Sequence, residues 1–334
     1  MKTKHLGHFA LFLVLTFYVL AHSQGNLGQS GGNFLQITAE PRGAALGGAG
    51  VAVISGAAAL YYNPAGAIST KNMSINLSYT DWFIDTKLAY GAIVKNLVKI
   101  GTIGISVTSF YMDDMEITTV YESEGTGEYF SAGDLVAGVS YARALTDRFT
   151  FGVTGKYIRE NIWNETADQF AFDVGSLYQT DFFGLRLGIA IRNISGKLKF
   201  EGNDIEQKIQ DELNQNIPDN PRVERLSPEF RVPQIFQIGI AFDPIKTDSW
   251  ALTVISDVET PNDNNERFIL GLEYSFRSFA YLRGAYRIKY DLGELSFGAG
   301  LHLPLSGVQT NLDYSFSNYG ILGDVHRIGF GISL

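Results

Sequence analysis

Cysteine and histidine carry much of the nucleophilic and metal chemistry of proteins, and this chain holds few of either. It has no cysteine and five histidines, so thiol nucleophiles, disulfides and cysteine-ligated metals are excluded. Only His302 and His326 lie beyond residue 23. Acyl transfer needs a nucleophile beside a general base, usually histidine, and neither histidine stands in a recognisable motif with a serine. The sequence predicts no catalytic residues and no enzymatic activity.

Two acidic runs, residues 113–116 and 262–266, offer oxygen atoms that a cation could use. Neither run has the ligand spacing of a known calcium loop, and we expect their carboxylates to be solvated. No glycine-rich loop follows a strand and opens a helix as a phosphate site requires. We therefore predict no metal and no cofactor.

The remaining charged candidates lie inside apolar segments that alternate with a period of two. Leu185, Leu187, Ile189 and Ile191 alternate with Arg186, Gly188, Ala190 and Arg192, and residues 295–303 and 328–334 repeat the pattern. Because side chains on a strand point alternately to opposite faces, such segments of about ten residues indicate a transmembrane β-barrel. The alternation places these polar residues on the lumenal face: Arg186, Arg192, Glu273, Arg283, Arg287 and His302. We expect them to form structural ion pairs, since unpaired buried charge is costly.

The full pattern predicts an all-β fold, a transmembrane antiparallel barrel of about fourteen strands over residues 71–334. The expected strands are 71–80, 86–96, 98–112, 131–144, 149–162, 168–179, 183–193, 234–243, 248–258, 266–276, 279–289, 293–303, 307–317 and 323–334. A lipid-facing Leu187→Arg change should impair assembly, whereas lumenal Gly188→Ser should be milder.

Short and long connections alternate between these strands. Barrels of this class have short periplasmic turns and longer external loops, so the alternation predicts that both chain termini are periplasmic. The longest connection is an external insertion at 194–233, in which residues 204–215 are a plausible short helix. This insertion is either a partner-binding loop or a solvated variable one.

Residues 1–23 predict export, because Lys2 and Lys4 precede an apolar stretch that ends at the small residues Ala21 and Ser23. Twelve apolar residues are too few for a membrane-spanning helix. Removal of this signal peptide takes two of the 26 basic residues and none of the 35 acidic ones, which leaves a net charge of −11. A nucleic acid is therefore not an expected partner.

Residues 24–70 differ from the strand pattern. Small residues crowd 43–50, residues 51–62 are apolar without alternation, and Asn63, Pro64, Ala65 and Gly66 form a strong turn signal. The segment is too rich in small residues for a strand and too rich in glycine for a stable helix. It is expected to pack as a plug in the barrel lumen.

Three stretches of this segment carry a family resemblance: residues 34–37, residues 41–50, which include Arg42, Gly47 and Gly48, and residues 59–66 with the Asn63 to Gly66 turn. Together they resemble the N-terminal signature of the PorV/PorQ family of outer-membrane proteins, which is related to FadL-type transporters. The resemblance implies a fourteen-stranded barrel with Arg42 among lumenal carboxylates and Asn63 and Pro64 fixing the reversal into the first strand.

The resemblance implies two functions. PorV-like members of the type IX secretion system carry secreted cargo proteins, which contact their external loops. This is the function we expect first, with secreted cargo proteins and secretion-system components as partners. FadL-like relatives pass hydrophobic small molecules through the outer membrane, which is the alternative. Both imply an outer-membrane location and contact with outer-membrane lipid.

Overall fold

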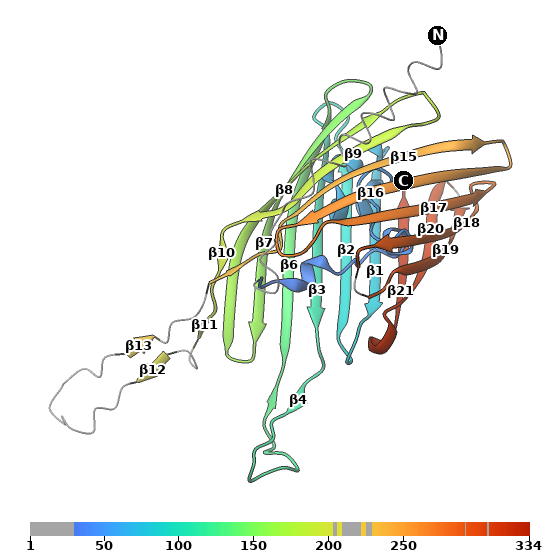
Figure 1. Ribbon diagram of the computed structural model, residues 1–334. Helices are drawn as coiled ribbons and strands as arrows, with labels where there is room; N and C mark the ends of the chain where they lie inside the picture. The colour runs from blue at the N-terminus through green and yellow to red at the C-terminus, as the bar shows by residue number, and fades with distance from the viewer. Residues whose placement is uncertain (1–29, 203–205, 209–221, 225–228, 291, 306) are drawn as a thin grey trace.

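The computed structural model describes residues 30–202, 206–208, 222–224, 229–290, 292–305 and 307–334. Fourteen long strands form one closed antiparallel barrel (Figure 1). They are β1 (Met73–Asp81), β2 (Lys87–Asn96), β3 (Thr102–Tyr111), β6 (Ala132–Ala144), β7 (Phe149–Ile162), β8 (Glu165–Gln179), β9 (Arg186–Ser195), β15 (Ile235–Lys246), β16 (Trp250–Pro261), β17 (Arg267–Phe276), β18 (Ala280–Ile288), β19 (Leu295–Leu305), β20 (Val308–Asn318) and β21 (Asp324–Ser333).

Each long strand pairs with its neighbour along the chain, and β1 pairs with β21 to close the ring. The sequence prediction of an all-β barrel of about fourteen strands is confirmed. The largest boundary difference is at β3, which begins at Thr102 where the pattern predicted residue 98. Closure leaves no open edge in the membrane zone, as a spanning sheet requires.

The alternating pattern sorts side chains to the two faces of the wall. Leu187, Phe297 and Phe330 are exposed on the outer face. The intervening positions point into the barrel, where Arg283 and Arg327 are among the most buried side chains. The wall therefore presents an apolar surface to lipid and a polar surface to the lumen. No helix in the described ranges is long and apolar enough to cross a membrane.

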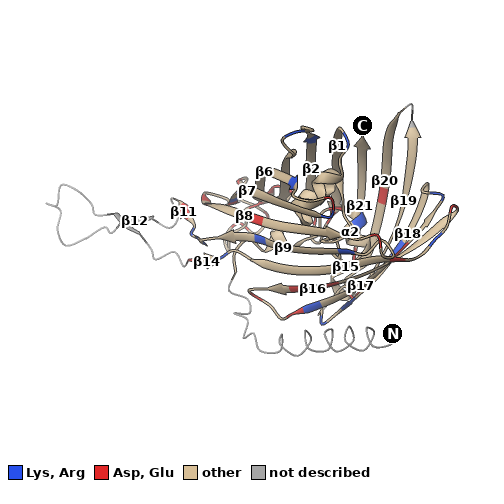
Figure 2. Cartoon of the chain, turned by 90° about the horizontal axis from the view of Figure 1, so that it is seen from above, with Lys and Arg blue, Asp and Glu red and all other residues tan. Residues whose placement is uncertain are grey.

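An N-terminal plug of short helical turns lies inside the ring of strands, as the position of α2 in the view from above shows (Figure 2). Its elements are η1 (Asn33–Gln36), α2 (Pro41–Ala45), η2 (Gly56–Ala58), α3 (Ala59–Tyr62) and η3 (Pro64–Ser69). Proline stands at the first position of α2 and of η3, where its missing N–H leaves no bond unmade. The preceding residues cap these turns, because the Glu40 carboxylate accepts from the Arg42 and Gly43 N–H groups and Asn63 Oδ1 accepts from the Ala65 N–H.

The plug meets the wall closely where the wall has glycine. A Cβ atom at Gly152 would collide with the backbone of Pro64 and Ala65, and one at Gly188 would collide with the backbone of Val51 and Ala52. Rigid backbone cannot make room as a flexible side chain can. The expectation that Gly188→Ser is milder than Leu187→Arg stays a prediction, but the lumen at this position is not open, because the plug fills it.

The remaining elements are short and lie in the connections: β4 (Met115–Glu116), β5 (Tyr129–Phe130), β10 (Lys197–Leu198), β11 (Glu201–Gly202), β12 (Glu206–Lys208), β13 (Arg222–Glu224), β14 (Phe230–Arg231) and η4 (Gly320–Leu322). β12 pairs with β13, so the predicted helix over 204–215 is wrong at residues 206–208. The rest of that helix and the predicted signal peptide 1–23 lie outside the described residues.

Candidate functional site

The candidate site is the contact between plug and lumenal wall, and Arg42 is its most strongly bound plug residue. Arg42 Nε and Nη2 donate to the two carboxylate oxygens of Glu273 on β17, each at 2.9 Å. Arg283 on β18 also donates to Glu273, at 2.7 Å, and to Asp313 on β20, at 2.6 Å. The side chain of Arg283 is 0% exposed and that of Glu273 is 6% exposed. Four charges in alternation therefore join the plug to three strands.

Glu40 lies beside this cluster and caps α2. Burial raises the pKa of Glu40 from 4.5 to about 7, and the Asp313 carboxylate adds to the rise. Its two hydrogen bonds from the Arg42 and Gly43 N–H groups act in the opposite direction. Glu40 is the one acidic residue of the plug, and its pKa lies near neutral pH.

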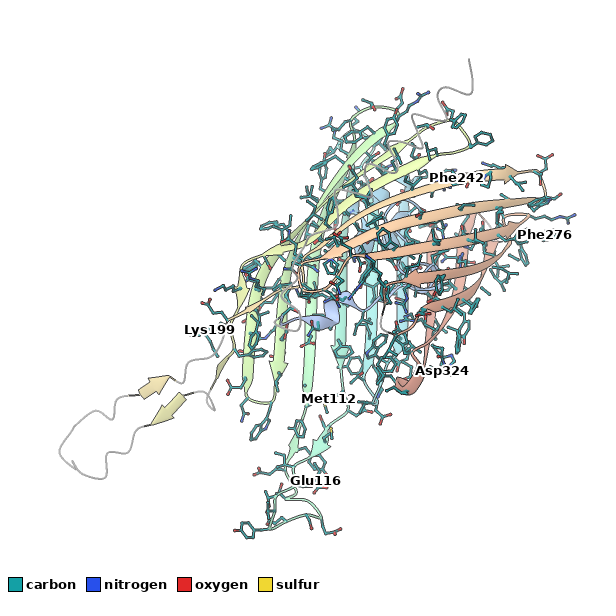
Figure 3. All side chains as sticks on the ribbon, in the orientation of Figure 1. Met112, Glu116, Lys199, Phe242, Phe276 and Asp324 are labelled. Atoms are coloured by element: carbon teal, nitrogen blue, oxygen red, sulfur yellow. The ribbon has the colours of Figure 1, made fainter. Side chains whose placement is uncertain are left out.

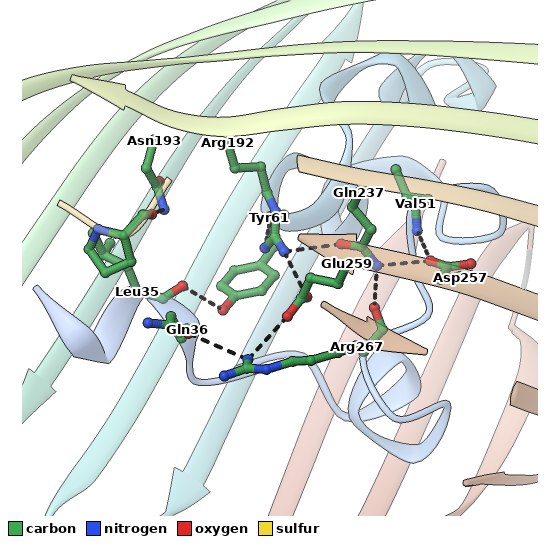
Figure 4. A network of polar contacts seen from close by, with 12 residues as sticks. Leu35, Gln36, Val51, Tyr61, Arg192, Asn193, Gln237, Asp257, Glu259 and Arg267 are labelled. Atoms are coloured by element: carbon green, nitrogen blue, oxygen red, sulfur yellow. Dashed lines mark hydrogen bonds and ion pairs between the residues drawn. The ribbon is translucent and has the colours of Figure 1, made fainter. Parts of the chain in front are cut away.

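A second polar network links the plug to β9, β15, β16 and β17 (Figure 4). Gln237 is central to it, because its Nε2 donates to the Gly48 carbonyl at 3.0 Å and to Asp257 at 2.8 Å. Arg192 donates to Gln237 Oε1 at 3.1 Å and lies 3.7 Å from Glu259. Gln237 thus binds the Gly48 turn of the plug directly, and the charged residues Asp257 and Arg192 hold Gln237 in position.

The same network reaches two further plug positions. The Asp257 carboxylate accepts from the Val51 N–H at 3.4 Å, and Arg267 joins Glu259 at 3.2 Å and Gln36 at 3.5 Å. The Arg192 guanidinium lies 5.7 Å from the centre of the Tyr61 ring. Burial raises the pKa of Tyr61 to about 12, so Tyr61 stays neutral and its hydroxyl donates to the Ile37 carbonyl.

The turn at Asn63 is fixed to the wall by its amide. Asn63 Nδ2 donates to the Val51 carbonyl of the plug and to the Ser176 carbonyl of β8, both at 2.9 Å. Ala65 and Gly66 are buried immediately after it. Gly47 and Gly48 both have positive φ, 69° and 95°, which only glycine adopts without strain.

Of the other sequence-predicted polar residues, Arg186 and Arg287 make pairings outside the Arg42 cluster, whereas His302 lies beside it. Arg186 pairs with Asp243 at 2.6 Å near the end of β15. Arg287 donates to the Gly293 carbonyl at 2.5 Å and stacks 4.6 Å from the centre of the Tyr290 ring. The His302 ring lies 4.2 Å from that of Tyr281. The six residues thus belong to several separate pairings and do not form one constellation.

Several residues of the site were missed in the sequence. Asp313, Gln237, Asp257 and Glu259 occupy lumenal positions of β15, β16 and β20. Strand parity alone could have found the first three, whereas Glu259 lies one residue beyond the predicted strand 248–258. Strand parity could not have predicted the β-bulge in the pairing of β8 with β9. There Asp173 accepts from the Asn193 N–H at 2.8 Å and pairs with Lys156 at 2.6 Å.

Among the described residues, two facing lumenal carboxyl groups on β6 and β7 form no salt bridge. Asp134 on β6 faces Glu160 on β7 directly across the strand pair. Glu160 is 7% exposed, and its Oε1 is a buried atom with no hydrogen-bond partner. Glu160 lies beside Gly32 and Leu35 at the start of the plug, so two carboxyl groups meet at this corner of the lumen.

Free space in this part of the lumen is small. A cavity of about 30 Å³ lies between the plug and β2, β3, β6, β7 and β9, and its lining includes Leu60, Tyr61, Lys156 and Arg192. That volume suits one water molecule and no organic ligand. Among the described residues, no three acids and histidines gather as they would around a metal ion.

On the side of the long connections, the β3–β6 connection projects as a hairpin (Figure 1). Met112 and Glu116 mark its base and first strand, and Phe276 lies at the opposite rim of the barrel (Figure 3). Residues 112–130 contain six acids and no lysine or arginine. Val120 and Tyr121 at its tip are 96% and 97% exposed. We call residues 112–130 the acidic hairpin.

Comparison with known proteins gives one family match. The family described as "Type IX secretion system protein PorV" matches residues 21–220 of this chain. The comparison with curated proteins finds no match.

Solved structures with the same fold are outer-membrane barrels of low sequence identity. The Pseudomonas putida toluene transporter TodX is 12% identical, with a TM-score of 0.56 over 93% of this chain and 99% of that one. The Ralstonia pickettii toluene transporter TbuX is 12% identical, with a TM-score of 0.54 over 88% and 96% of the two chains. A Pseudomonas aeruginosa FadL homologue is 12% identical, with a TM-score of 0.52 over 89% and 97%. At these identities the likeness concerns the fold alone.

Proposed function

Because this chain belongs to the PorV family of type IX secretion system proteins and is an outer-membrane β-barrel, we propose that it binds secreted cargo proteins through its external loops. In this proposal the barrel is a closed platform that acts by binding and does not catalyse a reaction. The proposal takes both chain termini to be periplasmic, as the alternation of short and long connections predicts, and this places the acidic hairpin at the cell exterior.

The filled lumen is the observation that carries this proposal. The plug is joined to the wall by the Arg42–Glu273 pair and by the Gln237 network. The cavity beside Tyr61 has a volume of only about 30 Å³. A barrel that passes a folded or unfolded chain needs a wide lumen, whereas a barrel that presents binding loops does not. Binding at the outer surface therefore fits this molecule better than conduction.

The acidic hairpin supplies a surface for such binding. Its stem is ordered by backbone bonds beyond β4 and β5, from the Ile117 N–H to the Glu128 carbonyl and from the Thr126 N–H to the Ile117 carbonyl, both 2.8 Å. The Lys87–Asp113 pair at 2.6 Å fixes its base. The remaining acids face solvent around an apolar tip, which favours a partner surface that is basic at its rim and apolar at its centre.

The test is co-purification of cargo from cells in mild detergent, followed by mass spectrometry. The variant carries Glu122→Gln, Glu124→Gln and Glu128→Gln in the hairpin. Its matched control carries Asp147→Asn, Asp181→Asn and Asp248→Asn, three exposed acids at the opposite rim. We expect secreted proteins that share a C-terminal domain to be recovered with wild type and control and to be reduced several-fold with the hairpin variant. Equal recovery with all three chains, or no secreted protein with any, would refute loop-mediated cargo binding.

A second candidate is uptake of hydrophobic small molecules, which the shared fold with toluene transporters supports. The same purification distinguishes it, because enriched lipophiles without bound secreted proteins would favour transport. That route would require the plug to move, since the cavity of about 30 Å³ holds no hydrocarbon ligand.

A further inference from the structure

The lipid-facing surface of the barrel carries a groove beside the turn between β17 and β18. Its volume is about 480 Å³, within the range of small-ligand pockets. Most outer positions of these strands bear large apolar side chains, but Ala280 and Ala299 bear a single methyl group and form the floor. Large side chains stand around them, namely Phe276, Leu282, Leu301 and Tyr314.

The strand register explains why the two alanines make one groove. Ala280 lies between Phe276 and Leu301 in one row of neighbouring residues, and Ala299 lies between Leu282 and Tyr314 in the next row. Each alanine leaves a gap between two large side chains. The gaps are one strand and one row apart, so they join into a single diagonal channel.

A cationic group stands at one end of this groove. Arg277 and Ser278 form a tight turn with positive φ at both residues, 50° and 51°. The exposed Arg277 guanidinium lies 5.4 Å from the centre of the Phe276 ring. Phe276 itself lies at the end of the β17–β18 hairpin, at the rim of the barrel (Figure 3). Arginine at a membrane rim is suited to a lipid phosphate, which it can bind with two donors.

We propose that this groove binds one acyl chain of a phospholipid whose phosphate pairs with Arg277. An acyl chain suits the groove because it brings no hydrogen-bonding groups into the hydrocarbon zone. The strands below are paired on both sides, so they offer no free edge to an added peptide strand. A peptide would leave its own N–H and C=O groups unsatisfied there. The proposal concerns the outer wall and is independent of cargo binding.

Tryptophan quenching can detect this lipid, because the Trp250 ring lies 6.1 Å from that of Tyr274, which lines the groove. A Trp82→Phe, Trp163→Phe chain keeps Trp250 as its one tryptophan. The full chain, stripped of lipid in detergent, is titrated with phosphatidylglycerol brominated in its acyl chains. We expect saturable quenching, because a groove of this size holds a single chain.

Two variants of the same single-tryptophan chain distinguish lipid binding in the groove from non-specific contact of lipid with the barrel wall. Ala299→Leu fills the floor and should abolish the saturable phase, whereas Ala137→Leu, on the outer face of β6 between Leu135 and Val139, should leave it unchanged. Arg277→Gln should raise the half-saturating lipid concentration about fivefold, since one basic residue near a membrane surface contributes about 1 kcal/mol.

Two results would overturn the proposal. One is quenching that never saturates or is unchanged by Ala299→Leu. The other comes from a photo-crosslinking amino acid placed at position 280 in cells. A protein adduct in place of a phospholipid adduct would show that the groove is a protein interface.

Discussion

The two sides of the barrel hold the plug by different physical means. On one side, which we call the ion-pair side, Glu273 of β17 binds Arg42, and Arg283 of β18 links Glu273 to Asp313 of β20. On the other, which we call the glycine side, β7 and β9 meet the plug backbone at Gly152 and Gly188, and β8 meets the Asn63 side chain at Gly175. The ion pairs on the ion-pair side are strong, but they depend on every charged partner being present. The contacts on the glycine side depend on close steric fit, so they tolerate changes of charge but no added atom.

This difference bears on whether the plug could ever move. Near the glycine side, Asp134 and Glu160 are unpaired and the Asp173 bulge interrupts the β8–β9 register. On the ion-pair side no equivalent irregularity interrupts the register of β17 with β18. A plug that loosened would therefore separate first from the glycine side, while Arg42 remained bound.

Removal of Arg283 should have the largest effect, because it leaves Glu273 and Asp313 with one fewer cation in a site closed to solvent. We expect Arg283→Met to lower the free energy of unfolding by about 3 to 5 kcal/mol, measured by urea titration in detergent. The control is Arg148→Met, which breaks the exposed pair of Arg148 and Asp181 and should cost at most about 1 kcal/mol. Similar losses in both variants would show that the ion-pair side is no stronger than a surface pair.

A methyl group on the glycine side should have the next largest effect. Gly188→Ala forces the wall against the Val51 carbonyl, so we expect a loss of about 1 to 3 kcal/mol and higher ion conductance in planar bilayers. Gly155→Ala is the control, because the nearest atom to its Cβ is a Phe172 ring carbon at 3.8 Å. If Gly188→Ala left both stability and conductance unchanged, contact by shape would not hold the plug on this side.

The sequence predicted the wall far better than it predicted these plug contacts. The fourteen strands follow from period-two alternation, since lipid outside and lumen inside impose opposite demands on successive residues. The same parity assigned Glu273 and Arg283 to the lumen. It could not pair Glu273 with Arg42, because that contact joins residues 231 positions apart and depends on how the barrel closes.

The glycine contacts were beyond sequence reasoning for a related reason. The sequence pattern identifies Gly188 only as a small residue that faces the lumen. The folded plug shows that the Val51 backbone occupies the space beside it. The insertion shows the opposite error. Local propensity favoured a helix over 204–215, but Glu206–Lys208 pairs with Arg222–Glu224, a choice that tertiary context makes and propensity does not.

Acidification tests the ion-pair side through Glu40. Its pKa rises from 4.5 to about 7 in the fold, so between these pH values the unfolded chain releases a proton that the native chain keeps. Stability should therefore fall as pH rises through this window, by about 2 kcal/mol. Thermal unfolding of wild type and Glu40→Gln from pH 4.5 to 7 measures this, and the variant should lose that part of the slope. A parallel slope in both chains would mean that Glu40 does not titrate differently on folding.

The smallest expected effect is a gain in stability beside the glycine side. Glu160→Gln replaces one of two facing carboxylates with an amide that can donate to Asp134, so a repulsive contact becomes a hydrogen bond. We expect thermal unfolding at neutral pH to show stabilisation of about 1 kcal/mol. Glu128→Gln in the acidic hairpin is the control and should change little, because that side chain is exposed. Destabilisation by Glu160→Gln would mean that the carboxylate pair is compensated in the membrane, for example by a bound cation. The two sides would then both rely on charge, and the distinction between them would rest on Gly152, Gly175 and Gly188 alone.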